Sequence, residues 1–214
     1  FASPNKIQQQ VEALESNKDC TICSHDVFLV DAKSKKFINP LRHHKSGVNS
    51  LMDLYAALPF FTHSSKMFLN DASDSFYDEL DPHAIDAEIH IAQAKRGNIY
   101  HIPCCLGSYR MMMGISYQSG VINPMIPAAI RRLYNSALVE NGRSRSEINK
   151  LKHYYANAIL NYGYHSALAG EKSDYIKYTR ESVKIRWVSP IQFAMYFFTI
   201  SPGLAIFMAR MRSR

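Results

Sequence analysis

The sequence predicts an α/β domain over residues 1–122, followed by an all-helical C-terminal extension over residues 123–214. Helical and strand patterns alternate as far as Arg110, whereas only helical patterns follow Asn123. The charge changes at the same place, because residues 1–122 hold 11 Lys and Arg against 13 Asp and Glu, and residues 123–214 hold 14 against 5. We therefore expect two parts with different roles that join near residues 119–123.

Helix starts in this chain share a signature, a capping residue followed by proline. The signature occurs at Ser3-Pro4, Asp81-Pro82, Asn123-Pro124, Ser189-Pro190 and Ser201-Pro202. The first pair predicts a helix that ends near Ser16 and presents an apolar face of Ile7, Val11 and Leu14. The pattern then predicts a strand over Cys20–Val30, a basic loop over Asp31–Gly47, a helix over about Ser50–Leu58 and a strand near Ser64–Leu69.

The most informative segment runs from Tyr77 to Arg110. It predicts an acidic loop, a helix capped by Asp81 with Pro82 at its first position, a stop at Gly97, and two strands, the second ending in Tyr109-Arg110. The apolar residues Ile85, Ile89 and Ala92 recur on this helix at helical spacing.

Asp86 lies near the start of that helix, where a carboxylate is held at a fixed angle beside backbone N–H groups without helical partners. Such a position suits a general base. The alternative is that Asp86 and Glu88 are ordinary first-turn acids that stabilise the helix.

The extension begins with three predicted helices. They cover Pro124–Asn141, ending at Gly142; a long stretch from a capping box of Ser144 and Glu147 to Gly170; and a segment capped by Ser173 or Asp174 that runs through Ile185.

The last segment, Ile191 to Met208, is rich in Phe, Met, Ile and Tyr and is followed by Arg210, Arg212 and Arg214. Polar residues and Ser201-Pro202 interrupt it, so two short helices fit better than one spanning helix. Three interpretations remain open: contact with the interface of an anionic membrane, cover for the domain core, or a true span.

Three segments in order resemble the second half of a family-2 glycosyltransferase of the GT-A fold. They are the Ser3-Pro4-Asn5-Lys6 helix with the strand at Asp19-Cys20-Thr21-Ile22-Cys23; Phe61-Thr62-His63-Ser64-Ser65-Lys66-Met67-Phe68; and the acidic helix with Gly97-Asn98-Ile99-Tyr100-His101-Ile102-Pro103 and Leu106-Gly107-Ser108-Tyr109-Arg110. The resemblance covers about residues 1–120. It implies transfer of a sugar from a nucleotide-sugar donor to an acceptor hydroxyl, with inversion at the anomeric carbon.

The resemblance assigns roles by position. Asp86 is the expected general base, with Glu88 the less favoured choice. His63, Ser64 and Ser65 are expected to line the sugar or acceptor pocket, although Ser64 and Ser65 alternatively only begin a strand. Tyr109 and Arg110 are expected to face the donor diphosphate.

The resemblance also places Phe1 directly after the family's Asp-x-Asp motif. The Mn²⁺ or Mg²⁺ ligands and the nucleotide-binding half are therefore expected upstream of Phe1, and residues 1–214 alone are expected to be inactive. Many relatives have a histidine two residues after the arginine, where this chain has Met112. A thioether is a poor ligand for these hard cations, which puts the metal arrangement in question.

Two other classes stay open. One is a non-catalytic module that binds saccharide or a partner; the other is a nucleic-acid binder that uses a stripe of Arg131, Arg132, Arg143, Arg145, Lys150 and Lys152. No nucleic-acid motif accompanies this stripe, so we expect no nucleic-acid partner. The four cysteines lack zinc-finger spacing and are expected to be reduced thiols. The expected location is the cytoplasm. A second interpretation adds peripheral contact with the inner face of the cell membrane.

Overall fold

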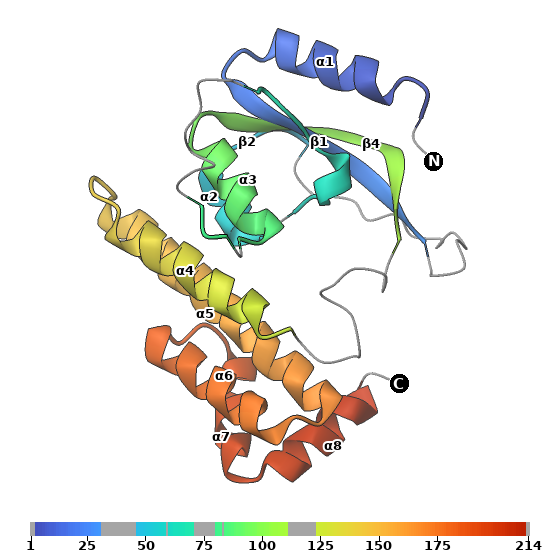
Figure 1. Ribbon diagram of the computed structural model, residues 1–214. Coiled ribbons are helices and arrows are strands. Elements are labelled where there is room, and N and C mark those ends of the chain that lie inside the picture. Colours follow the sequence, from blue (N-terminus) through green and yellow to red (C-terminus); the bar gives the residue numbers. More distant parts are fainter. Residues whose placement is uncertain are drawn as a thin grey trace. The chain divides into compact units, whose positions relative to one another are not determined.

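The computed structural model describes residues 3–30, 46–58, 60–70, 80–82, 84–110 and 123–212 (Figure 1). The chain divides into two compact units, residues 1–114 and residues 115–214. A mixed sheet with helices forms the first unit, and the described part of the second unit contains helices only. The α/β class with a helical C-terminal part is therefore confirmed. The basic loop over 31–45 and most of the predicted junction, residues 119–122, lie outside the described residues.

The elements of the first unit follow one another along the chain. They are α1 (Lys6–Ser16), β1 (Cys20–Val30), β2 (Gly47–Asn49), α2 (Leu51–Ala56), a 3₁₀ turn (His63–Ser65), β3 (Met67–Phe68), α3 (Asp86–Ala94) and β4 (Asn98–Arg110). The strands form one sheet in the order β2-β4-β1-β3, in which β1 and β4 are parallel and β2 and β3 run antiparallel to their neighbours. Helix α1 covers one face of the sheet, and α2 and α3 lie on the other (Figure 1).

The central pair β1 and β4 forms the core of the sheet. Strand β1 has the predicted bounds, and Ile22 and Ile99 are fully buried on adjacent strands. The prediction of two strands after Gly97 is wrong, because β4 is one strand of 13 residues. Pro103 has no backbone N–H, and the pairing register shifts beside it, so the strand bulges there instead of ending.

Helix α1 buries only Leu14 of the predicted apolar face. Ile7 is 60% exposed and Val11 37% exposed, whereas Gln10, Ala13 and Leu14 are buried. The reason is a polar anchor: the side-chain amide of Gln10 donates hydrogen bonds to the backbone carbonyl oxygens of Cys23 (3.3 Å) and Ser65 (3.0 Å). A hydrophobic pattern carries no information on such a long-range polar contact.

The predicted start of α3 is wrong. The helix begins at Asp86, with Ile85 at the N-cap, and Asp81 instead accepts a hydrogen bond from the backbone N–H of Ala84 (2.8 Å) in a preceding turn. The buried face also differs from Ile85, Ile89 and Ala92. It consists of Ala87, Glu88, His90, Ile91, Gln93 and Ala94.

Gly97 lies where α3 passes into β4 across the start of β1. A Cβ atom at this position would lie 2.7 Å from Thr21 Cγ2 and 2.8 Å from the backbone oxygen of Asp19. The backbone oxygen cannot move aside as a side chain can, so a larger residue here would force the backbone to shift.

We expect Gly97→Ala to lower the free energy of unfolding of the first unit by about 1–3 kcal/mol, because the added methyl group overpacks this crossing. Urea unfolding followed by circular dichroism measures the change. Gly203→Ala is the matched control, since nothing lies within 4 Å of a Cβ there and alanine favours the helix by about 0.5–1 kcal/mol. Equal stability of the two variants would contradict the close packing described at Gly97.

The second unit is a stack of helices. They are α4 (Met125–Val139), α5 (Arg145–Ala169), α6 (Lys172–Ile185), α7 (Pro190–Phe197), a 3₁₀ turn (Phe198–Ile200) and α8 (Pro202–Arg212). The capping box of Ser144 and Glu147 is present, and Gly170 ends α5 at φ +90°, as predicted. Helix α6 begins slightly earlier than Ser173, with Glu171 at its N-cap.

The last two helices break at Ser201-Pro202, as predicted, and Ser189 caps α7 with Pro190 at its first position. Among the described helices, none combines the length and the apolar composition that a crossing of the bilayer requires. The spanning interpretation of Ile191 to Met208 is therefore wrong.

Candidate functional site

Two of the predicted site residues meet at the first turn of α3. The side chain of Asp86 is 62% exposed and that of His63 is 52% exposed, and His63 Nδ1 lies 3.5 Å from Asp86 Oδ1. Asp86 comes from the helix and His63 from the 3₁₀ turn His63–Ser65, 23 positions earlier in the chain. The pair presents a carboxylate to solvent with an imidazole beside it, which is an arrangement suited to proton transfer.

A second histidine lies behind this pair. His90 is fully buried, and its Nε2 is 3.3 Å from His63 Nδ1, with the two rings stacked at a centroid distance of 5.5 Å. The Phe61 ring also packs against His90, at a centroid distance of 4.7 Å. Sequence analysis missed His90. The available signal was its position four residues after Asp86, on the same side of a helix.

Burial holds His90 neutral. Desolvation, together with the smaller effects of the nearby Lys66 and His63, lowers the pKa of His90 to about 3. Its Nδ1 has no hydrogen-bond partner in the described part of the chain.

Lys66 completes the cluster. Its ammonium group donates a hydrogen bond to the side-chain oxygen of Gln93 on α3 (2.8 Å). Burial lowers the pKa of Lys66 to about 8, while the negative charge of Asp86 acts in the opposite direction. A cation therefore lies near the candidate base, and sequence analysis had not selected it. We call His63, Lys66, Asp86 and His90 the α3 cluster.

The buried His90 predicts acid sensitivity of the first unit. Unfolded histidine has a pKa near 6.5, so above pH 6.5 both states are neutral and His90 adds no pH dependence. Below pH 6.5 His90 binds a proton in the unfolded chain, whereas in the folded state it stays neutral down to about pH 3. The free energy of unfolding should therefore fall by about 1.4 kcal/mol per pH unit, or about 2 kcal/mol between pH 6.5 and pH 5.

Amide hydrogen exchange of β1 and β4 at pH 6.5 and pH 5 measures this loss for the first unit. His90→Phe should reduce it, because phenylalanine cannot take up a proton in the unfolded state. His165→Gln is the control, since His165 is exposed on α5, and it should leave the loss unchanged. A His90→Phe protein with the full acid sensitivity would contradict the role of His90.

The other predicted residues near α3 have structural partners. Ser65 is fully buried and its hydroxyl donates to the backbone oxygen of Thr62 (2.8 Å). Glu88 is buried and its Oε2 accepts from the backbone N–H of Ile85 (2.9 Å), which stabilises the helix start. Ser64 is exposed, with its backbone oxygen accepting from Lys6 Nζ (2.9 Å). The predicted strand at Ser64 and Ser65 is a 3₁₀ turn, and the strand there is limited to Met67–Phe68.

Tyr109 and Arg110 are the last two residues of β4 and pair with Leu29 and Val30 at the end of β1. On α3, the backbone oxygen of Gln93 in the last turn accepts a hydrogen bond from the hydroxyl of Thr21 at the start of β1 (3.2 Å). Asp86 lies at the other end of this helix.

The described residues do not fit a divalent metal. They contain no group of three or more His, Cys, Asp or Glu side chains able to hold an ion. The ammonium group of Lys66, a member of the α3 cluster, repels a second cation there. Cys20 and Cys23 are buried in the core beside α1, and burial raises their pKa values to about 11 and 12, so they are poor thiolate ligands.

The sheet also contains a buried polar network that sequence analysis missed. Ser24 Oγ lies 2.8 Å from His101 Nδ1, and His101 Nε2 lies 3.0 Å from Asp26 Oδ1. The combination of side chains is that of a hydrolytic triad, but all three residues are at most 3% exposed. No substrate can reach the serine, so the network is a structural link between β1 and β4.

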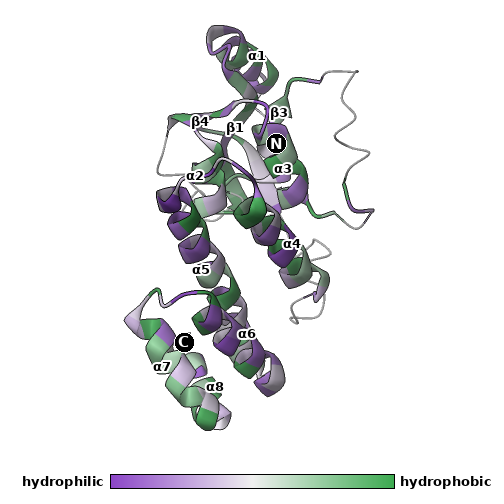
Figure 2. Ribbon diagram, turned by 90° about the vertical axis from the view of Figure 1, so that its left-hand side faces the viewer, coloured by the Kyte–Doolittle hydropathy of each residue, from purple (hydrophilic) through white to green (hydrophobic). Residues whose placement is uncertain are grey.

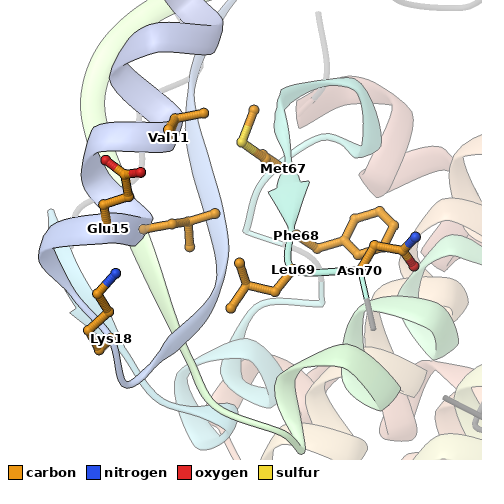
Figure 3. A pocket seen from close by; sticks show the side chains of 8 residues that line it. Val11, Glu15, Lys18, Met67, Phe68, Leu69 and Asn70 are labelled. Atoms are coloured by element: carbon orange, nitrogen blue, oxygen red, sulfur yellow. The ribbon is translucent and has the colours of Figure 1, made fainter. Parts of the chain in front are cut away.

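A shallow groove of about 310 Å³ lies between α1 and the edge strand β3 (Figure 3). Val11, Leu14, Met67, Phe68 and Leu69 form its apolar lining, and Glu15, Lys18 and Asn70 complete it. It contains neither member of the Asp86 and His63 pair, so it is separate from the candidate base.

Comparisons with protein-family models, with curated proteins and with solved structures find no match to this chain.

Proposed function

We propose that this chain carries the acceptor half of an inverting family-2 glycosyltransferase of the GT-A type, with Asp86 as the general base. One observation carries the proposal: the first turn of α3 presents an exposed carboxylate, with the imidazole of His63 3.5 Å away. The order of the elements also supports it. Helix, strand, His-Ser-Ser segment, acidic helix and a strand ending in Tyr-Arg occur in the sequence that the resemblance implies.

The proposed step is a single displacement. The acceptor hydroxyl gives its proton to Asp86, its oxygen forms a bond to the anomeric carbon, and the bond from that carbon to the donor phosphate oxygen breaks. The nucleoside diphosphate leaves with the electron pair of the broken bond. His63 orients the carboxylate at 3.5 Å and the buried, neutral His90 orients His63. Tyr109 and Arg110 are proposed to face the diphosphate, since a guanidinium group matches phosphate geometry.

The test is sugar transfer by the full-length protein, measured as release of nucleoside diphosphate over a panel of sugar nucleotides with hydroxyl acceptors, in Mn²⁺ or Mg²⁺. Turnover of one donor supports the proposal and identifies the donor. Binding of a saccharide in calorimetry, without turnover of any donor, would overturn the transferase proposal and favour a non-catalytic binding module. In the nucleic-acid stripe, Arg131 and Arg143 are paired with Glu181 and Glu140, which leaves fewer of its cations for phosphate contacts.

A further inference from the structure

The outward face of the last two helices is apolar. Trp187, Ile191, Phe193, Phe197, Ile200 and Phe207 are each between 51% and 82% exposed. The hydrophobic colouring of α7 and α8 is evident in Figure 2. Monomeric soluble proteins rarely expose a continuous apolar patch of this kind without a partner. We call this face the α7–α8 surface.

Two polar residues of this segment are buried. Gln192 is fully buried, and its side-chain amide donates to Ser182 Oγ (2.7 Å) and to the backbone oxygen of Arg186 (2.9 Å). Thr199 is buried, and its hydroxyl donates to the backbone oxygen of Tyr196 (2.8 Å). This is the reverse of a water-facing helix, which buries its apolar side chains and exposes its polar ones.

The orientation of the α7–α8 surface is determined by packing on its inner side. Ala205 and Ile206 of α8 pack with Ala167 of α5 and Tyr175 of α6. The Tyr175 hydroxyl donates to the backbone oxygen of Met195 on α7 (2.5 Å). The exposed aromatic residues therefore cannot turn inward without breaking this core.

The sequence of the last segment carries positive charge only. Residues 187–214 contain no Asp or Glu, and Arg210, Arg212 and Arg214 follow the apolar stretch. Beside Trp187, Arg186 lines a groove of about 670 Å³ with Arg145, Lys150 and His153, and no acidic residue takes part in that lining. Apolar side chains next to a basic groove match the acyl chains and phosphates of an anionic lipid layer.

We propose that the α7–α8 surface inserts into the interface of an anionic membrane, with the basic groove facing the lipid headgroups. Helices of 8 and 11 residues reach only about 12 and 17 Å, against a hydrocarbon core of about 30 Å, so they lie in the interface and do not cross it. A second copy of this chain is a poorer occupant, because a two-fold contact brings the same cations together. Trp187 and Tyr196 are residue types enriched at the headgroup level.

The experiment uses Trp187, the single tryptophan of these 214 residues, as a reporter, and Trp187→Phe in the full-length protein identifies its share of the emission. The full-length protein is mixed with vesicles of phosphatidylcholine alone, or with phosphatidylglycerol added at three parts in ten. We expect cosedimentation with the anionic vesicles, a blue shift of Trp187 emission, and quenching by brominated acyl chains. Phe193→Ser combined with Phe197→Ser should weaken partitioning at least about tenfold, because two aromatic rings lose apolar burial. Lys150→Glu should reduce the preference for anionic over neutral vesicles.

Val139→Ser is the matched control, since Val139 is 79% exposed at the end of α4, outside the α7–α8 surface, and should bind as the parent does. Unchanged emission and no sedimentation with anionic vesicles would overturn the proposal. A stable dimer in light scattering without lipid, lost in the double Phe variant, would identify a second copy as the occupant and would also overturn it. These outcomes do not depend on sugar transfer.

Discussion

Asp86→Asn in the full-length protein is expected to lower kcat for sugar transfer by about 10²–10⁴-fold, the usual contribution of a general base. Asparagine keeps the shape of the side chain but has no site for the acceptor proton. Because 62% of the Asp86 side chain is exposed and Glu88 provides the helix cap, the variant should fold as the parent does. Binding of the donor, measured by calorimetry, should change little.

Asp174→Asn is the control for this variant, since Asp174 is also a first-turn acid, on α6 in the other unit. It should retain full activity. A second variant, His63→Gln, tests the positioning role: it should lower kcat less than Asp86→Asn does and should alter the pH profile of kcat. Full activity of Asp86→Asn would remove Asp86 from the mechanism and leave the fold description intact.

The largest stability effect is expected for Asp26. Asp26→Ala should lower the free energy of unfolding of the first unit by about 3 kcal/mol or more, because His101 loses a 3.0 Å partner in a site closed to water. Ser24→Ala should cost only about 1 kcal/mol, the usual net contribution of a single hydroxyl hydrogen bond. Hydrogen exchange of the β1 and β4 amides reports the loss.

Replacing the whole network separates packing from polar pairing. Ser24→Ala, Asp26→Leu and His101→Phe together should recover much of the stability that Asp26→Ala loses, because apolar groups of similar volume need no partner. Phe60 already lies edge-on to the His101 ring at 5.9 Å and would accept a phenylalanine there. A triple variant no more stable than Asp26→Ala would show that the site needs its polar groups.

Local signals in the sequence predicted several elements well. Strand β1 has the expected bounds, and the capping box of Ser144 and Glu147, the left-handed Gly170 and the Ser189-Pro190 start are present. Each of these depends on contacts within a few residues of the chain, so the pattern contains the physical cause. Asp81-Pro82 had the same signature and failed, because its backbone is engaged in a turn before α3.

The sequence by itself determined the α/β class, the helical C-terminal part, most helix ends and the position of Asp86 in a first turn. Only the tertiary structure decided which side chains meet. His63 and His90 come together across 27 positions, and Ser24 and His101 across 77. Burial lowers the pKa of His90. Packing also buries Gln10 and Gln192 and leaves Phe193 and Phe197 exposed. Helical and strand periodicities describe one element at a time, whereas these outcomes depend on the neighbours that packing supplies.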